Sequence, residues 1–237
     1  MAVEQSVVEY KGFGKCARLA NGTVELLATL DMGPRIIRFG FIGGKNEFCE
    51  ALDKGSDTPN GFWPMIGGHR LWHSPEDMPL TYTIDDRPVD YQWLENGLKV
   101  TSQVDIHSGL QKELIITMDA QGTSVKVTHN LYNKNPWPVE YSAWALSVMA
   151  TGGVSIIPQN TEDTDLLPNR YMTIWPYTKF SDPRLVLGDK YILFRQDPNA
   201  TTKCKIGLAN HCGWTAYIND KVMFIKKFKH IDGAVYP

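Results

Sequence analysis

Apolar residues recur at every second position along most of this chain. In the run 98–106, for example, Leu98, Val100, Val104 and Ile106 fall on one side, and polar or charged residues fall on the other. A period of two is the repeat of an extended strand with one buried face, whereas an amphipathic helix repeats every 3.6 residues. The pattern therefore predicts strands rather than helices.

The same alternation recurs about a dozen times, and turn residues such as Asn-Gly, Gly-Gly and Asn-Asp separate the runs. Many short strands between turns are typical of a sandwich or a barrel. We find no linker, repeat or charge block, so the sequence predicts a single all-β domain over residues 1–237. The predicted strands are 23–30, 35–42, 98–106, 111–118, 124–132, 139–149, 154–158, 171–177, 191–195, 205–209, 214–218 and 222–227.

Composition and charge narrow the class of partner. The chain has 24 basic and 26 acidic residues and a formal charge of −2, so no general field attracts a nucleic acid. No apolar run approaches the roughly 20 residues of a membrane helix, and the first ten residues lack the pattern of a signal peptide. Four cysteines without a CxxC pair are expected to be free thiols. We therefore expect a cytoplasmic protein without a nucleic-acid or membrane partner.

The segment from Asp53 to Asp90 breaks the alternation and is rich in Gly, Pro, Trp, Asp and His. We predict a long irregular loop here, and long ordered loops are where binding residues tend to lie. Its centre, from Gly67 to Glu76, reads Gly-Gly-His-Arg-Leu-Trp-His-Ser-Pro-Glu. A sugar needs a flat apolar face for its ring and planar donors and acceptors for its hydroxyls, and this run supplies both.

The run has two other interpretations. His69 and His73 have the spacing of a metal-binding pair on a helix, but the preceding glycines and the following Ser-Pro disfavour a helix, so no metal site is predicted. Alternatively, His69 and Arg70 satisfy buried carbonyl groups and Trp72 belongs to the core. This structural interpretation and ligand binding both stay open.

Several motifs, taken in order, resemble an uncharacterised branch of the galactose-mutarotase-like (aldose 1-epimerase-like) superfamily. The resemblance runs from about Thr23 to the end of the chain and implies a galactose-mutarotase-like β-sandwich, or supersandwich. The motifs are Gly67 to Trp72 with Pro75-Glu76, Gly33 to Arg38 with Asn46, Pro79 to Tyr82 with Asp85 and Arg87 to Val89, Gly109 to Glu113, His129 to Asn133, Ala143 to Leu146 with Gly152-Gly153, and Gly213-Trp214.

The resemblance also implies an activity. Characterised mutarotases open and reclose the ring of an aldose without a cofactor, so that its α and β anomers interconvert. A histidine protonates the ring oxygen, and a carboxylate from a late strand removes the anomeric hydroxyl proton. Carried onto this chain, the resemblance implies that His69 is the catalytic proton carrier. The implied contacts to a sugar or sugar acid come from Arg35, Arg70, Trp72, His73, Tyr82 and Lys226.

The chain departs from the family pattern at two places. It reads Ser142-Ala143-Trp144 where better-known mutarotases have a histidine, and it stops at Pro237, where relatives continue into the strands that carry the carboxylate. We therefore expect a sandwich that lacks its last C-terminal strands, with an exposed sheet edge that permits self-association. Glu113 and Glu140 are the internal candidates for the missing carboxylate.

Two functions stay open at this point. The chain is an aldose 1-epimerase-like enzyme, or it is a non-catalytic carbohydrate-binding domain on the same fold. A lyase-like use of the sandwich, with Tyr82 beside Arg70, is a third alternative.

Overall fold

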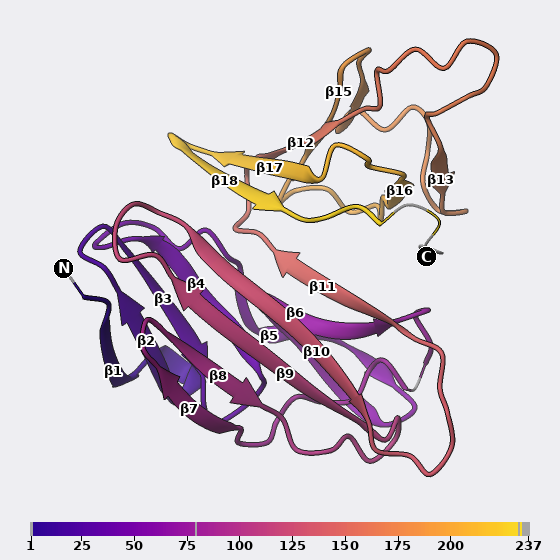
Figure 1. Cartoon of the computed structure of the whole chain (residues 1–237). Coiled ribbons are helices and arrows are strands. Elements are labelled where there is room, and N and C mark those ends of the chain that lie inside the picture. Colours follow the sequence, from indigo (N-terminus) through magenta and orange to yellow (C-terminus); the bar gives the residue numbers. More distant parts are fainter. Residues whose placement is uncertain (1, 79, 232, 234–237) are drawn as a thin grey trace. The chain divides into compact units, whose positions relative to one another are not determined.

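The computed structural model describes residues 2–78, 80–231 and 233. These residues form eighteen strands and one short 3-10 turn and contain no α-helix, which confirms the all-β prediction (Figure 1). No helix in the described part is long and apolar enough to cross a membrane. The contacts divide the chain into two compact units, one up to Met149 and one from Ala150 onward. Each unit is described by itself, and a single domain stays a prediction.

The first unit consists of a seven-stranded and a four-stranded antiparallel sheet. The larger sheet has the strand order β1-β2-β3-β4-β6-β11, with β5 paired to β6, and the smaller one has the order β10-β9-β8-β7. The elements are β1 (Glu4–Glu9), η1 (Lys11–Phe13), β2 (Lys15–Ala20), β3 (Val24–Thr29), β4 (Arg35–Phe41), β5 (Glu50–Thr58), β6 (Gly61–Ser74), β7 (Asp90–Leu94), β8 (Gly97–Thr101), β9 (Leu110–Met118), β10 (Val125–Asn133) and β11 (Ser142–Val148).

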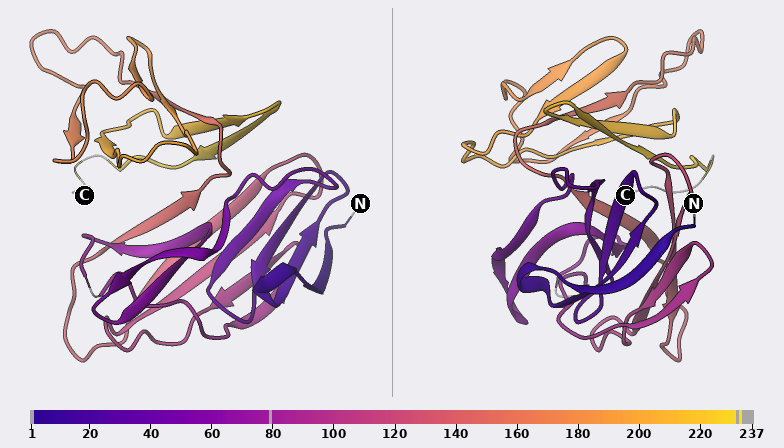
Figure 2. Two further views of the ribbon diagram at one scale, coloured as in Figure 1. Left: turned by 180° about the vertical axis from the view of Figure 1, so that it is seen from behind. Right: turned by 90° about the vertical axis from the view of Figure 1, so that its left-hand side faces the viewer.

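The two sheets of this unit face each other, as Figures 1 and 2 show from opposite sides. Alternate residues of the smaller sheet, among them Leu98, Val100, Leu114 and Ile116, are completely buried. This is the arrangement of a β-sandwich, in which the inner faces of two sheets make the core. A second apolar core joins β2, β3 and β4 to η1 and consists of Phe13, Cys16, Leu27, Ile37 and Ile66.

The prediction of an irregular loop from Asp53 to Asp90 is wrong. Strand β5 pairs with the first half of β6, and β11 pairs with the second half, so that among the described residues the irregular part begins only after Ser74. Neither strand alternates, for opposite reasons: most of β5 is exposed, whereas the second half of β6 is buried on both faces. A strand buried on both faces has no polar side and therefore lacks the period of two.

The glycine pair at the centre of β6 permits close contact with the neighbouring strands. Gly67 and Gly68 both have positive φ angles, of 93° and 69°, in the region that other residues rarely adopt. A Cβ on Gly67 would overlap the carbonyl oxygen of Cys49, and a Cβ on Gly68 would overlap that of Ile36. The pair therefore fixes how β6 packs against β4 and against the start of β5.

The second unit contains a five-stranded sheet with the order β14-β15-β12-β17-β18 and a two-stranded sheet of β13 and β16. All four cysteines of the chain are free thiols, as the sequence predicts. The strands of this unit are β12 (Val154–Pro158), β13 (Met172–Ile174), β14 (Leu185–Leu187), β15 (Tyr191–Arg195), β16 (Ile206–Leu208), β17 (Trp214–Asn219) and β18 (Val222–Lys227).

Candidate functional site

Strand β6 presents the predicted site residues on two opposite faces. Successive side chains of a strand point to alternate sides of the sheet, so Arg70 and Trp72 share one face, and His69 and His73 share the other. Arg35 of β4 pairs directly with Arg70 and lies on the same face. The structure thus brings the two arginines together and separates them from both histidines.

Arg70 lies at the centre of a group of aromatic rings that we call the arginine–aromatic cluster: Arg70, Trp63, Trp72, Tyr82 and Trp144. The guanidinium carbon is 4.0 Å from the ring centre of Trp72 and 4.9 Å from that of Trp63. Tyr82 contacts both indoles, with ring centres 5.0 and 5.2 Å away, and Trp144 of β11 lies 5.8 Å from Trp72. A cation over aromatic faces at these distances is attracted by the ring quadrupoles.

Two buried arginines share one acceptor beside this cluster. Arg35 and Arg70 both donate to the carbonyl oxygen of Met65, and Arg35 also donates to Gly67. Burial and the positive charge of Arg35 lower the pKa of Arg70 to about 9, so Arg70 remains charged at neutral pH. Arg35 is paired with Asp85 at 2.9 Å. The sequence predicts both arginines as ligand contacts, and the structure makes them neighbours.

Three buried nitrogen atoms on this face have no hydrogen-bond acceptor among the described residues. They are Nε of Arg35, Nε of Arg70 and Nε1 of Trp72. A buried donor without an acceptor is costly, and each one in a folded protein calls for an explanation. Oxygen atoms of a ligand or of water would supply acceptors.

A carboxylate lies at the rim of the arginine–aromatic cluster. Tyr82 is half-buried, and its hydroxyl group donates a hydrogen bond to Glu76, which is exposed on the segment after β6. The charge of Glu76 also acts on Arg70, whose pKa it raises in opposition to burial. Glu76 belongs to the predicted Gly67 to Glu76 run, but no feature of that run singles it out.

His69 lies between the two sheets of the first unit. Its Nε2 atom is 2.7 Å from Nε2 of His129 on β10, and its Nδ1 atom is 2.8 Å from Oγ of Ser147 on β11. The ring of Phe48 stacks against it at 6.5 Å. This chain of hydroxyl and imidazole groups can pass a proton, because each group both donates and accepts.

His73 lies four residues along the same face of β6, about 13 Å from His69 at the rise of a strand. It is buried, its ring packs against Tyr141 at 4.5 Å, and Thr81 is its hydrogen-bonding neighbour at 3.4 Å. Burial and the charge of Lys112 lower the pKa of His73. Both predicted histidines are therefore interior residues of the sandwich.

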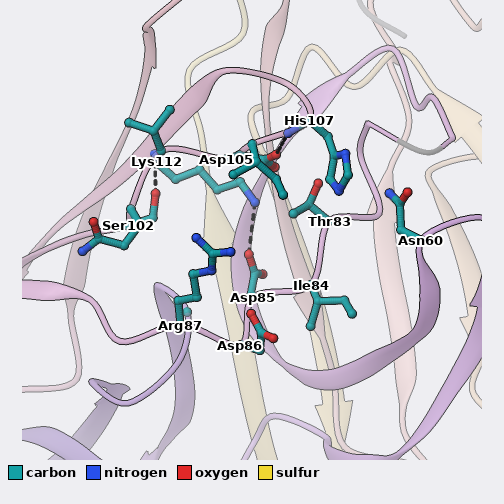
Figure 3. Close-up of a pocket in the computed structure, with 14 residues that line it drawn as sticks. Asn60, Thr83, Ile84, Asp85, Asp86, Arg87, Ser102, Asp105, His107 and Lys112 are labelled. Carbon is teal, nitrogen blue, oxygen red and sulfur yellow. Dashed lines mark hydrogen bonds and ion pairs between the residues drawn. The ribbon is translucent and has the colours of Figure 1, made fainter.

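A cavity of about 180 Å³ is lined by charged, polar and apolar residues of the segments 83–87 and 102–107, together with Lys112 (Figure 3). Asp85 and Lys112 line it and form an ion pair at 3.1 Å. Asp85 also holds Arg35, so the cavity and the arginine–aromatic cluster are connected through two ion-paired side chains. The sequence singled out neither Asp85 nor Lys112 as a site residue, although both stand in motifs that carry the family resemblance, and that signal could have identified them.

The remaining candidates lie elsewhere. Glu113 faces the outer side of β9, where it accepts hydrogen bonds from Asn130 and Tyr132, and Glu140 is exposed beyond β10. Lys226 is half-buried on β18 of the second unit, and burial lowers the pKa of its ammonium group to about 8. Within the described residues, no group of three or more His, Cys, Asp or Glu could hold a metal ion.

Comparison with protein-family models, with curated proteins and with solved structures finds no match for this chain. The structure by itself establishes an all-β protein with sandwich-like sheets. The galactose-mutarotase-like assignment stays a prediction.

Proposed function

We propose that this chain is a carbohydrate-binding protein with a galactose-mutarotase-like sandwich, and that the arginine–aromatic cluster is its sugar site. The observation that supports the proposal is the guanidinium group of Arg70 between the indoles of Trp63 and Trp72. Arginine offers planar donors to hydroxyl oxygens, and indole and phenol rings offer flat apolar faces to a pyranose. Trp144 and Tyr82, both half-buried, are the rings of the cluster that a ligand reaches most directly.

The register of β4 and β6 favours the same proposal, because it places the donors of Arg35 and Arg70 next to each other. The glycine pair holds β6 close to β4, and this keeps Arg35 and Arg70 side by side.

Interconversion of aldose anomers is the second candidate, and the hydrogen-bonded pair of Glu76 and Tyr82 favours it. The reaction needs a base for the anomeric hydroxyl proton and an acid for the ring oxygen. Glu76 would be the base and Tyr82 the acid, both within the reach of a sugar stacked on the cluster. His69, the proton carrier that the family resemblance implies, lies on the opposite face of β6 from Arg70 and would act only from there.

Binding is tested by titration of intrinsic tryptophan fluorescence with a panel of aldoses, alduronic acids and their oligomers. Trp144→Ala is expected to weaken binding at least tenfold, because it removes an accessible ring of the cluster. Trp137→Ala is the matched control, since this indole is 60% exposed on the loop before β11 and outside the cluster. Equal affinity of the two variants for every sugar would sink the proposed site.

The reaction is tested separately by exchange NMR, which measures the rate of α–β interconversion for the same sugars. Glu76→Gln is expected to slow any catalysed exchange by about 100-fold or more, as loss of a general base does. Glu95→Gln, an exposed carboxylate between β7 and β8 and outside the cluster, is the control. A loss of exchange in His69→Ala, with the full rate in Glu76→Gln, would assign the catalytic proton transfer to His69 instead of Glu76. Sugar binding without any catalysed exchange would support a non-catalytic carbohydrate-binding domain rather than an enzyme.

A further inference from the structure

The cavity in Figure 3 contains the buried ammonium group of Lys112, which has unused hydrogen-bonding capacity. Lys112 lies on the inner face of β9, between the buried residues Leu110 and Leu114, and is itself only 5% exposed. Its Nζ atom donates to Oδ1 of Asp85, and within the described residues this is its one hydrogen bond. An ammonium group has three donors. Figure 3 shows the side chain reaching toward Asp85 in the middle of the lining residues.

Around Asp85, which lines this cavity, buried positive charge exceeds buried negative charge. Arg35, Arg70 and Lys112 are all nearly inaccessible, and all three act on the one carboxylate of Asp85. Both oxygens of Asp85 are occupied, Oδ1 by Lys112 and Oδ2 by Arg35. A charge buried without a partner is strongly unfavourable, so such a group calls for a further anion.

The other charged side chains of the lining do not supply that anion. Asp86 and Arg87 are exposed, and their opposite charges are screened by solvent. Asp105 is half-buried, and its Oδ1 atom accepts the backbone N–H groups of His107 and Ser108, which fixes it as a turn residue. Asp85 is therefore the one carboxylate that Lys112 contacts among the described residues.

The rest of the lining decides what kind of anion fits. Thr83 supplies a hydroxyl group, Ile84, Val104 and Ile106 supply apolar surface, and the ring of His107 points toward the cavity in Figure 3. The volume of about 180 Å³ is below the roughly 300–1,000 Å³ of sites for drug-sized ligands. Apolar surface beside a cation suits the hydrocarbon part of an organic acid better than an inorganic ion.

We propose that this cavity is a binding site for a small organic carboxylate, with the ammonium group of Lys112 as its anchor. The carboxylate accepts the unused donors of Lys112, and the apolar part of the ligand lies against Ile84 and Val104. The site is distinct from the arginine–aromatic cluster and does not depend on the proposed sugar binding. The two sites are coupled only through Asp85 and Arg35.

The experiment is an NMR titration of the ¹⁵N-labelled chain with butyrate at constant ionic strength. Parallel titrations use chloride, inorganic phosphate and D-glucose. Butyrate is expected to give saturable shifts confined to the amides of residues 83–87 and 102–107, with an affinity at least tenfold above that of phosphate. No shift with butyrate, or equal shifts with D-glucose or phosphate, would overturn the carboxylate site.

Lys112→Met removes the anchor and is expected to weaken butyrate binding at least tenfold. Lys126→Met on the exposed face of β10 is the matched control and is expected to bind normally. If Lys112→Met does not fold, reductive methylation of the unmodified protein decides the question: butyrate must slow the labelling of Lys112 and of no other lysine. Trp144→Ala is expected to retain butyrate binding, which separates failure of this site from failure of the sugar site.

Discussion

The Nε2 atoms of His69 and His129 lie 2.7 Å apart, and this contact joins the seven-stranded sheet to the four-stranded sheet. At that distance one nitrogen donates a proton and the other accepts it, so the two rings share a single proton between them. The neighbouring layer is apolar, with Leu71 and Leu114 buried beside the pair. The bridge is therefore a specific polar link within the core of the sandwich.

Replacement of His129 by alanine is expected to lower the free energy of unfolding by about 1–3 kcal/mol. The change removes a partner of a buried ring nitrogen, and a lost partner costs the desolvation of the group that remains. Urea unfolding at pH 7.5, followed by tryptophan fluorescence, measures the difference. His107→Ala, at an exposed turn position, is the control and is expected to stay within about 0.5 kcal/mol of the wild type. An unchanged His129→Ala variant would mean that the contact contributes nothing to stability.

Arg70→Met is expected to fold with equal or greater stability and to lose carbohydrate binding. Arg70 is buried beside a second arginine, its pKa is lowered by burial, and its Nε atom has no acceptor among the described residues. Methionine fills a similar volume without a buried charge, and such replacements are often neutral or stabilising. The test pairs urea unfolding with the fluorescence titration.

Arg38→Met is the contrasting variant for this prediction. Arg38 is paired with Glu25 at 2.8 Å, so its replacement is expected to destabilise the chain and to leave sugar binding intact. A strongly destabilised Arg70→Met variant would indicate that Arg70 is a structural residue, as one interpretation of the sequence holds.

The sequence predicts twelve of the eighteen strands and leaves out β1, β2, β7 and β14, besides the hairpin of β5 and β6. It fails at β5 and β6, because a strand exposed on both sides and a strand buried on both sides lack the alternation on which the prediction depends. The positive φ angles of Ile66, Gly67 and Gly68 interrupt the pattern further. As a result, the sequence predicts a loop where β5 and β6 form a hairpin.

The same error affects the candidate site. His69 and Arg70 are adjacent in the sequence and read as one group on a loop, but a strand presents them on opposite faces. Arg70 meets Trp63 within β6 itself, whereas the ion pair of Asp85 with Lys112 depends on a contact between segments that are distant in the sequence. Residue types alone identify the arginine and the aromatic side chains, and only the register of β6 decides which of them meet.

The stability of the chain is expected to fall in acid partly through Asp85. Burial raises the pKa of this carboxyl group, but Lys112 and Arg35 outweigh burial and hold the pKa below its ordinary value of about 3.9. The folded state therefore binds fewer protons than the unfolded chain, so the contribution is present above about pH 4 and is lost as the pH falls through the folded-state pKa. Unfolding in urea across pH 2–7 measures this loss.

Asp85→Asn removes this titrating group, so the variant should lack its contribution to the pH dependence of stability. At pH 7 the variant is expected to lose about 3–5 kcal/mol, because two buried cations lose their carboxylate. The difference from the wild type should shrink as the pH falls through the lowered folded-state pKa of the wild-type carboxyl group. Asp86→Asn, at the exposed neighbouring position, is expected to follow the wild-type curve. A constant gap between wild type and Asp85→Asn at every pH would exclude Asp85 as a source of the acid dependence.

Gly68→Ala is expected to destabilise the chain far more than Gly43→Ala, although both glycines have nearly the same φ angle, 69° and 73°. At Gly43 an added Cβ meets no atom within 4 Å, so the variant bears only the backbone cost of an alanine at positive φ, about 1–2 kcal/mol. At Gly68 the same Cβ overlaps the carbonyl oxygen of Ile36 and lies 3.1 Å from the Cα atom of Ile37. Strands β4 and β6 must then separate, which also moves Arg35 away from Arg70. Urea unfolding measures the loss of unfolding free energy in each variant, and the difference between the two losses is the steric part. Sugar titration of Gly68→Ala reports the displacement of the two arginines. Equal losses in the two variants would show that β6 does not need its close contact with β4.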